Sequence, residues 1–85
     1  MSNKIVDVQN VVLQEILTNL RADAQLTQKQ LSKQLNRPQS YVSKYESGER
    51  KLTLMEIRSI VISCGSNLET FVATFEEELK VIEVQ

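Results

Sequence analysis

Residues 26–50 hold the pattern that most restricts how this chain can fold, because they predict two short helices joined by a tight turn. Thr27 and Gln30 have the spacing of a capping box, in which each side chain satisfies a backbone amide that the first turn of a helix leaves unpaired. Leu31 and Leu35 follow four residues apart and share one face of that helix. The first helix of the pair therefore begins near Thr27 and packs its leucine face inward.

The turn and the second helix follow directly along the chain. Asn36 tolerates a left-handed backbone, which lets one helix end and the chain turn. Pro38 suits the first position of a new helix, where its missing N–H has no hydrogen bond to lose. Val42 and Tyr45 give the second helix an inward face, and Gly48 marks its end. Many small domains use two helices joined in this way to present one helix to the major groove of DNA.

The polar side chains of the second helix are left facing outward: Gln39, Ser40, Ser43 and Lys44. A glutamine can pair with adenine through two hydrogen bonds, and serine and lysine can reach base edges or phosphates. On an isolated helix the same residues would be ordinary solvated side chains. Because a capped helix and a turn precede them and a basic loop follows, we predict that they contact the bases of DNA.

The distribution of charge agrees with this prediction, although the chain as a whole carries a net charge of −1. Residues 21–51 contain seven basic and three acidic residues, a net of +4, whereas residues 52–85 contain two basic and six acidic ones, a net of −4. The local sign governs contact with phosphate, and an acidic far side discourages nonspecific binding. Short charged segments also segregate by chance, so charge alone does not establish a nucleic-acid partner.

The composition fits one small domain with a single core, which we expect to span residues 1–85 with its packed part at about residues 8–79. The chain has 85 residues, of which 41% are hydrophobic. It has no run of about 18 apolar residues and no signal-peptide pattern, so we expect no membrane segment and a cytoplasmic location. Cys64 is the only cysteine and lies in an apolar stretch, which excludes an internal disulfide and favours a core position.

An enzymatic function is not expected from this composition. The sequence has no histidine, which excludes a histidine-based triad, proton shuttle or metal site. Two glycines are too few for a glycine-rich phosphate loop. The acidic residues at 76–78 could contribute to a cation site, but consecutive positions on a helix point in different directions. We therefore predict no catalytic residue, no metal and no cofactor.

Helices are also predicted on both sides of this pair. One spans about residues 7–24, where apolar residues recur at steps of three and four: Leu13, Ile16, Leu17, Leu20 and Ala24. Another opens at Thr53, with Glu56 completing a second capping box, and ends at Gly65. The residues of this helix that are predicted to face inward are Leu54, Ile57, Val61 and Cys64.

A last helix opens at Ser66 or Asn67, which are alternative caps. Its apolar stripe comprises Leu68, Phe71, Val72, Phe75 and Leu79. This stripe is first of all core, and it is wide enough for part of it to face a second subunit. Residues 80–85 either extend this helix or form a short strand, and residues 5–8 have a similar β-branched character. Such a strand would need a partner, for example across a dimer.

Residues 37–50 (RPQSYVSKYESGER) resemble the most specific part of the helix-turn-helix proteins of the Cro and phage-repressor type. The likeness extends over about residues 20–68. It implies an all-α, five-helix, lambda-repressor-like DNA-binding domain with its helix-turn-helix at about residues 27–46. It also implies a short, single-domain bacterial regulator in which the second and third helices together contact the DNA.

By this resemblance, phosphate contacts flank the residues that contact bases. At the start of its helix, Gln28 would hold a phosphate with its side-chain amide and the exposed helix N-terminus. The full set of phosphate contacts that the resemblance implies is Gln28, Arg37, Tyr41, Ser47, Arg50 and Lys51. Lys29 and Lys33 are expected to be mainly solvated.

The resemblance further implies a structural ion pair between Arg21 and Glu46, which would link the end of the first helix to the end of the recognition helix. Members of the family usually carry glycine or another small residue where Gln25 and Asn36 stand. They usually carry a serine or threonine cap where Pro38 stands. The recognition helix of this chain has therefore lost its most obvious hydroxyl cap, which leaves the exact base contacts open.

Together these predictions favour a sequence-specific DNA-binding transcriptional regulator that reads the major groove with the helix at about residues 38–46. The resemblance implies a homodimer on a near-palindromic operator. The main alternative is an antitoxin that binds a toxin partner as well as DNA, because antitoxins often resemble this family and the acidic last helix could contact a protein. A purely structural helical module is a third possibility, which the basic recognition face disfavours.

Overall fold

The computed structural model describes residues 4–83, with side chains from residue 8 onward, and this part of the chain is helical without strands. The helices are α1 (Lys4–Asp23), α2 (Gln28–Gln34), α3 (Ser40–Glu46), α4 (Leu54–Ser63) and α5 (Leu68–Glu83). The predicted all-α class with five helices is therefore confirmed for the described residues.

Local capping explains where three of these helices begin. Thr27 and Thr53 each form a complete capping box, so both predicted boxes are confirmed. Asn67 is the cap used before α5, because its Oδ1 accepts a hydrogen bond from the Thr70 amide at 2.8 Å. Of the two caps that the sequence allowed for the last helix, the structure thus uses Asn67 rather than Ser66.

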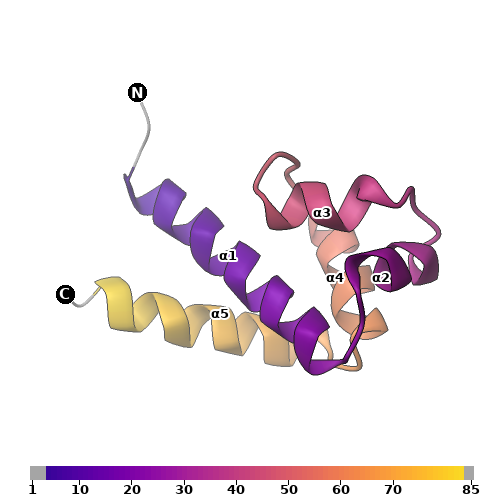
Figure 1. Cartoon of the computed structure of the whole chain (residues 1–85). Coiled ribbons are helices and arrows are strands. Elements are labelled where there is room, and N and C mark those ends of the chain that lie inside the picture. The colour runs from indigo at the N-terminus through magenta and orange to yellow at the C-terminus, as the bar shows by residue number, and fades with distance from the viewer. Residues whose placement is uncertain (1–3, 84–85) are drawn as a thin grey trace.

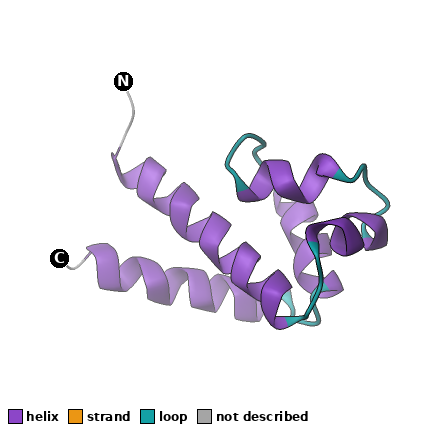
Figure 2. Ribbon diagram, viewed as in Figure 1, coloured by secondary structure: helices purple, strands orange, loops and turns teal. Residues whose placement is uncertain are grey.

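The helices form a long pair and a short cluster (Figure 1). α1 contacts α3, α4 and α5, and both ends of the described chain lie on the same side of the molecule. α2 and α3 pack against each other on the opposite side, and short loops join the successive helices (Figure 2). This arrangement holds α2 and α3 at the surface, where α4 packs against α2 and α1 packs against α3.

The core lies where the helices converge. It is formed by buried apolar side chains from all five helices, namely Leu17, Leu31, Tyr41, Val42, Tyr45, Ile60, Val61 and Phe71. The predicted inward faces of α2 and α3 are confirmed, since Leu31 and Val42 are 0% exposed and Tyr45 is 2% exposed. The core thus fixes which face of α3 remains available to solvent.

One side-chain prediction for α4 is wrong, and the apolar stripe predicted for α5 is only partly buried. Leu54, which was expected to face inward, is 60% exposed, because the first turn of α4 extends beyond the packed core. Ile60, which is not among the residues predicted to face inward, lies in the core and is 0% exposed. On α5, Phe71 and Leu79 are buried whereas Val72 is 42% exposed, so the buried stripe is narrower than predicted.

Both chain-end segments are helical where the structure describes them. α5 continues to Glu83, so the strand alternative for residues 80–83 is wrong, and residues 84 and 85 lie outside the described part. Residues 5–8 belong to α1, which begins at Lys4 and not near Asp7 as predicted. A strand pairing across a dimer therefore has no basis in these segments.

Gln25 adopts the left-handed backbone conformation that usually favours glycine, with φ of 61°. This conformation costs a non-glycine residue about 1–2 kcal/mol. Glycine removes that cost from the folded state, but it also gives the unfolded chain more conformational entropy, which offsets about half of the gain in stability. We expect Gln25→Gly to raise the free energy of unfolding by about 0.5–1 kcal/mol, measured by urea denaturation. The control Gln9→Gly, inside α1, should lower it by about 1 kcal/mol. A Gln25→Gly protein no more stable than wild type would contradict this account.

Candidate nucleic-acid interface

α2 and the turn after it are fixed by local hydrogen bonds. Thr27 Oγ1 accepts from the Gln30 amide at 3.0 Å, and Gln30 Oε1 accepts from the Thr27 amide at 2.9 Å. After α2, Asn36 has φ of 57°, as its tolerance of a left-handed backbone predicted. The Arg37 amide then donates to the Ser32 carbonyl at 2.9 Å, which closes the turn.

The recognition helix α3 begins at Ser40, two residues later than the position of Pro38 had predicted. Pro38 instead belongs to the preceding turn, where its carbonyl accepts from the Tyr41 amide at 2.9 Å. Gln39 is the N-cap residue, and its backbone is already helical with φ of −53° and ψ of −35°. The turn therefore leads directly into α3 and places Gln39 at the tip of the helix.

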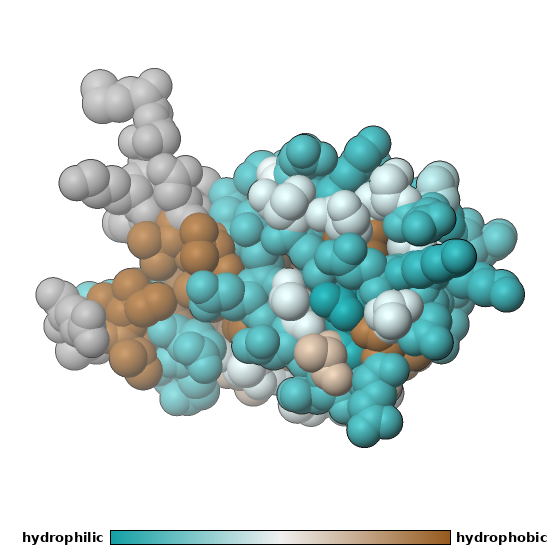
Figure 3. Space-filling model, in the orientation of Figure 1, coloured by the Kyte–Doolittle hydropathy of each residue, from teal (hydrophilic) through white to brown (hydrophobic). Residues whose placement is uncertain are grey.

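The four residues predicted to contact bases, Gln39, Ser40, Ser43 and Lys44, are all exposed. The structure brings Gln39, Ser40 and Ser43 together with Thr27 and Gln28 along one shallow groove between α3 and the start of α2. Arg21 and Lys29 also line this groove, so Lys29 lies closer to the recognition face than its predicted solvated role suggested. Figure 3 shows that the surface over α2 and α3 is largely hydrophilic.

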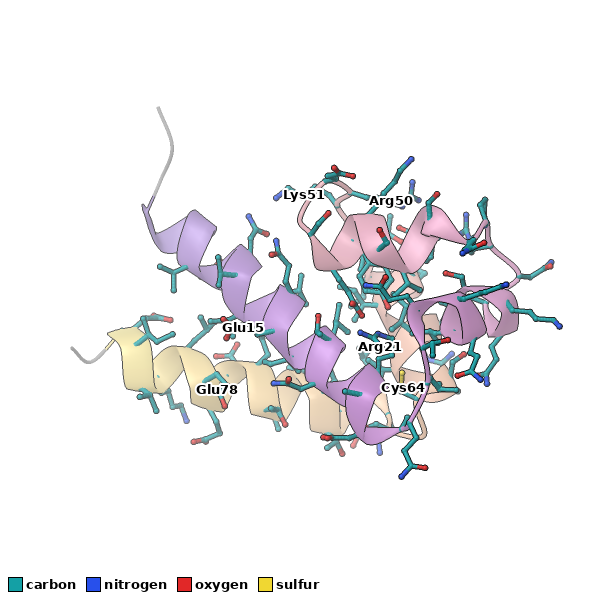
Figure 4. The ribbon with its side chains drawn as sticks, viewed as in Figure 1. Glu15, Arg21, Arg50, Lys51, Cys64 and Glu78 are labelled. Atoms are coloured by element: carbon teal, nitrogen blue, oxygen red, sulfur yellow. The ribbon has the colours of Figure 1, made fainter. Side chains whose placement is uncertain are left out.

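Arg21 and Glu46 form the ion pair that the resemblance implied. Arg21 Nε lies 2.7 Å from Glu46 Oε2, and the two side chains are 16% and 7% exposed. Arg21 also donates through Nη1 to the Leu26 carbonyl at 2.7 Å, and its hydrogen bond with Glu46 holds its pKa above the usual range. Figure 4 shows Arg21 extending from the end of α1 toward the helix-turn-helix. The pair therefore ties α1, the loop before α2, and α3 together.

Gln28 joins this network. Its Nε2 donates to Glu46 Oε1 at 2.9 Å, so part of the side chain predicted to hold a phosphate is engaged inside the protein. A side-chain amide has a second N–H and a carbonyl oxygen, which leaves Gln28 further capacity for hydrogen bonding. Its position in the groove keeps it beside the base-contacting residues.

Tyr41 lies elsewhere than the sequence suggested. It was expected to flank the groove and touch the DNA backbone, but it is 7% exposed and its hydroxyl donates to Glu56 Oε2 at 3.1 Å. The guanidinium groups of Arg37 and Arg50 lie 5.0 and 5.1 Å from the centre of its ring. The Tyr41 ring therefore supports these two arginines and is itself part of the core.

Glu56 organises the same cluster, although the sequence identified it only as a cap. Its Oε2 lies 2.7 Å from Arg50 Nη2 and 3.6 Å from Arg37 Nη2, while its Oε1 accepts from the Thr53 amide at 2.9 Å. One carboxylate thus holds the start of α4 and two partly exposed arginines that lie beside α3.

The loop after α3 supplies the remaining predicted phosphate contacts. Ser47, Arg50 and Lys51 are exposed, and Figure 4 shows Lys51 at this loop and Arg50 beside α3. Ser47 Oγ donates to the Lys44 carbonyl at 3.0 Å, which uses its hydroxyl hydrogen within the protein. Gly48 has φ of 87°, a conformation that glycine adopts without strain. The loop can therefore turn sharply and present its basic side chains.

Glu56 gives the protein a testable acid sensitivity. Hydrogen bonds from the Thr53 amide and from Arg50 lower the pKa of its carboxyl group from 4.5 to about 2. Because the folded-state pKa is the lower one, this stabilisation is complete above about pH 5 and is lost as the pH falls toward 2. We expect Glu56→Gln, measured by urea denaturation, to destabilise the protein at pH 7 and to make stability less dependent on pH between 5 and 2. The exposed control Glu76→Gln should keep the wild-type pH dependence, and an unchanged dependence in Glu56→Gln would refute the assignment.

The described residues offer little for other site chemistries. Among them, no group of three or more acidic, cysteine or histidine residues is arranged to hold a metal ion. Cys64 is half-buried, and burial raises the pKa of its thiol. Within residues 4–83, no helix is both long and apolar enough to cross a membrane.

Comparisons with known proteins agree with this geometry. Residues 17–71 match the helix-turn-helix family HTH_3, which covers the end of α1 through the start of α5. The solved structure of an XRE-family like protein from Pseudomonas syringae pv. tomato str. DC3000 superposes with a TM-score of 0.83. It is 32% identical in sequence, and the match covers 88% of this chain and 92% of that one. Comparison with curated proteins gives no significant match. The chain belongs to the HTH_3 family of DNA-binding helix-turn-helix proteins of the Cro and phage-repressor type.

Proposed function

We propose that this protein is a sequence-specific transcriptional regulator that inserts α3 into the major groove of DNA. The observation that carries the proposal is the shared groove of Gln39, Ser40, Ser43 and Gln28. Gln39 stands at the N-terminal tip of α3, and the N-terminal residues of a recognition helix are the ones that reach base edges in this class of docking. Gln39 is therefore the main candidate for contact with an adenine.

Phosphate contacts on both sides of the groove would fix the position of α3. Gln28 lies at the start of α2, and Arg37, Ser47, Arg50 and Lys51 lie in the turns before and after α3. In the proposal these side chains position the protein and carry no sequence information of their own. Tyr41 and Glu56 act indirectly, by holding Arg37 and Arg50 at the surface.

We further propose that the regulator acts as a homodimer on a near-palindromic operator. A mostly apolar hollow lies between α1 and α5, lined by Val8, Val11, Val12, Ile82 and the single charged residue Glu15, and Val11 is 50% exposed. Figure 3 shows hydrophobic surface at this end of the molecule, away from α2 and α3. Contact between two such surfaces would leave both recognition helices available to DNA.

Selection of DNA duplexes from a random-sequence library tests both proposals. We expect a near-palindromic consensus whose half-sites are about 10 base pairs apart, one helical turn. Binding of the selected duplex should weaken steeply with salt, and each phosphate contact contributes about 0.9 to the slope of log K against log salt. A single half-site would argue against the dimer, and recovery of no preferred sequence would argue against a sequence-specific regulator.

Binding of a protein partner as well as DNA is the second candidate function. The observation that favours it is the outer surface of the end of α5, where Val81 is 63% exposed beside the exposed residues Glu77 and Glu78. A toxin-type partner would cover this surface. Co-purification of this chain with the product of a neighbouring gene, in a fixed ratio and without DNA, would support the antitoxin alternative.

A further inference from the structure

The recognition helix has no side-chain cap of its own. Gln39 occupies the N-cap position of α3, and its side chain makes no capping hydrogen bond. By contrast, α2, α4 and α5 are each capped by the residue that precedes them. The first turn of a helix contains backbone amides that need an acceptor, so the start of α3 requires one from elsewhere in the chain.

Ser32 on α2 supplies this acceptor. Its side chain is completely buried, and Oγ accepts a hydrogen bond from the Val42 amide at 3.3 Å. Val42 stands three residues after Gln39, at the position whose amide an N-cap side chain ordinarily satisfies. The same Oγ donates to the Gln39 carbonyl at 3.2 Å. One hydroxyl of α2 therefore holds both ends of the first turn of α3.

We infer that Ser32 is a positioning residue for DNA recognition, which caps α3 from a neighbouring helix and sets the place of Gln39. The inference rests on the proposed function of α3 as the recognition helix. Base contacts depend on the exact position of a side chain, whereas contacts of flexible basic side chains with phosphate do not. Loss of the Ser32 hydroxyl should therefore weaken specific binding more than nonspecific binding.

Because Ser32 is buried, removal of its hydroxyl should affect mainly the first turn of α3. In Ser32→Ala, the Val42 amide would stay inside the protein without an acceptor, and water has no ready access to replace the hydroxyl. The first turn of α3 would open more often, and Gln39 would lose the bond that holds its carbonyl. Ser32→Cys keeps a side chain of similar size with much weaker hydrogen bonding, so it separates the effect of packing from that of the hydroxyl.

The test combines amide hydrogen exchange with DNA binding in wild type, Ser32→Ala, Ser32→Cys and the control Ile60→Val. Ile60 is 0% exposed on α4, and its truncation should lower stability to a similar extent without removing a hydrogen bond of α3. In both Ser32 variants we expect about tenfold faster exchange of the Val42 amide and about tenfold weaker binding of the duplex selected by wild type. Binding of a scrambled duplex should change little, and Ile60→Val should bind both duplexes as wild type does.

Each other result would overturn the inference in an identifiable way. Unchanged exchange at Val42 in Ser32→Ala would refute the cap, and wild-type behaviour of Ser32→Cys would assign the effect to packing. Equal weakening of both duplexes, or the same loss in Ile60→Val, would show an effect of general stability. Failure of wild type to prefer any duplex would refute the proposed function and the recognition role of Ser32, while exchange at Val42 would still decide whether Ser32 caps α3.

Discussion

Replacement of Glu46 by alanine is expected to lower the free energy of unfolding by about 3 kcal/mol, because it leaves a largely buried guanidinium without its carboxylate. Arg21 is 16% exposed and makes two hydrogen bonds to Glu46, so solvent would compensate little for their loss. Gln28 would lose its acceptor as well. Small domains have only about 5–15 kcal/mol of stability in total, so the variant would lose a large share of it.

Thermal and urea denaturation would measure this effect, with Glu49→Ala as the control. Glu49 lies three residues further along the chain and is exposed, so its removal should change the free energy of unfolding by less than about 0.5 kcal/mol. If Glu46→Ala changed stability no more than Glu49→Ala, the Arg21 pair would be an ordinary surface contact, worth about 0–1 kcal/mol.

The double variant Gln39→Ala, Lys44→Ala is expected to bind its selected duplex at least about 100-fold more weakly than wild type. A bidentate glutamine–adenine contact is worth about 1–3 kcal/mol, and a lost lysine contact adds to this. Both residues are exposed, so the free energy of unfolding should hardly change. Fluorescence anisotropy on the selected and scrambled duplexes would measure the affinities, and circular dichroism would verify the fold.

A matched control removes the same two residue types from the neighbouring helix. Lys33 and Gln34 are exposed on α2 and are not part of the recognition helix α3. Lys33→Ala, Gln34→Ala therefore changes charge and composition identically but should retain specific binding. If both double variants weakened binding equally, the effect would be one of net charge, and α3 would not be the helix that determines specificity.

The starts of α2 and α4 were predictable because the interactions that set them are local. Thr27 and Thr53 each bond within the next three residues, so the spacing in the sequence contains nearly all the information. Asn36 likewise predicted the left-handed turn, because asparagine tolerates that backbone conformation. Gln25 was harder to predict, because it adopts the same conformation without that tolerance, at the end of α1, where the Gln25 and Leu26 amides donate to the Ala22 and Arg21 carbonyls.

The outward face of α3 was also predictable in its broad character. Once Val42 and Tyr45 are placed inward, helical geometry leaves the polar residues between them facing out. Tyr41 broke this pattern, because the approach of α4 covers its ring and brings Glu56 to its hydroxyl. A pattern on one helix cannot show which of its side faces another helix will cover.

The sequence by itself determined the number of helices, the capping boxes of α2 and α4, and the polar residues that α3 can offer to DNA, because these depend on contacts within one helical turn. The tertiary structure alone decided that Ser32 caps α3 and that Glu56 holds Arg37 and Arg50. These bonds join residues 6 to 19 positions apart, on different elements of the fold. No local spacing encodes such a meeting, since it depends on how the buried faces of all five helices pack against one another.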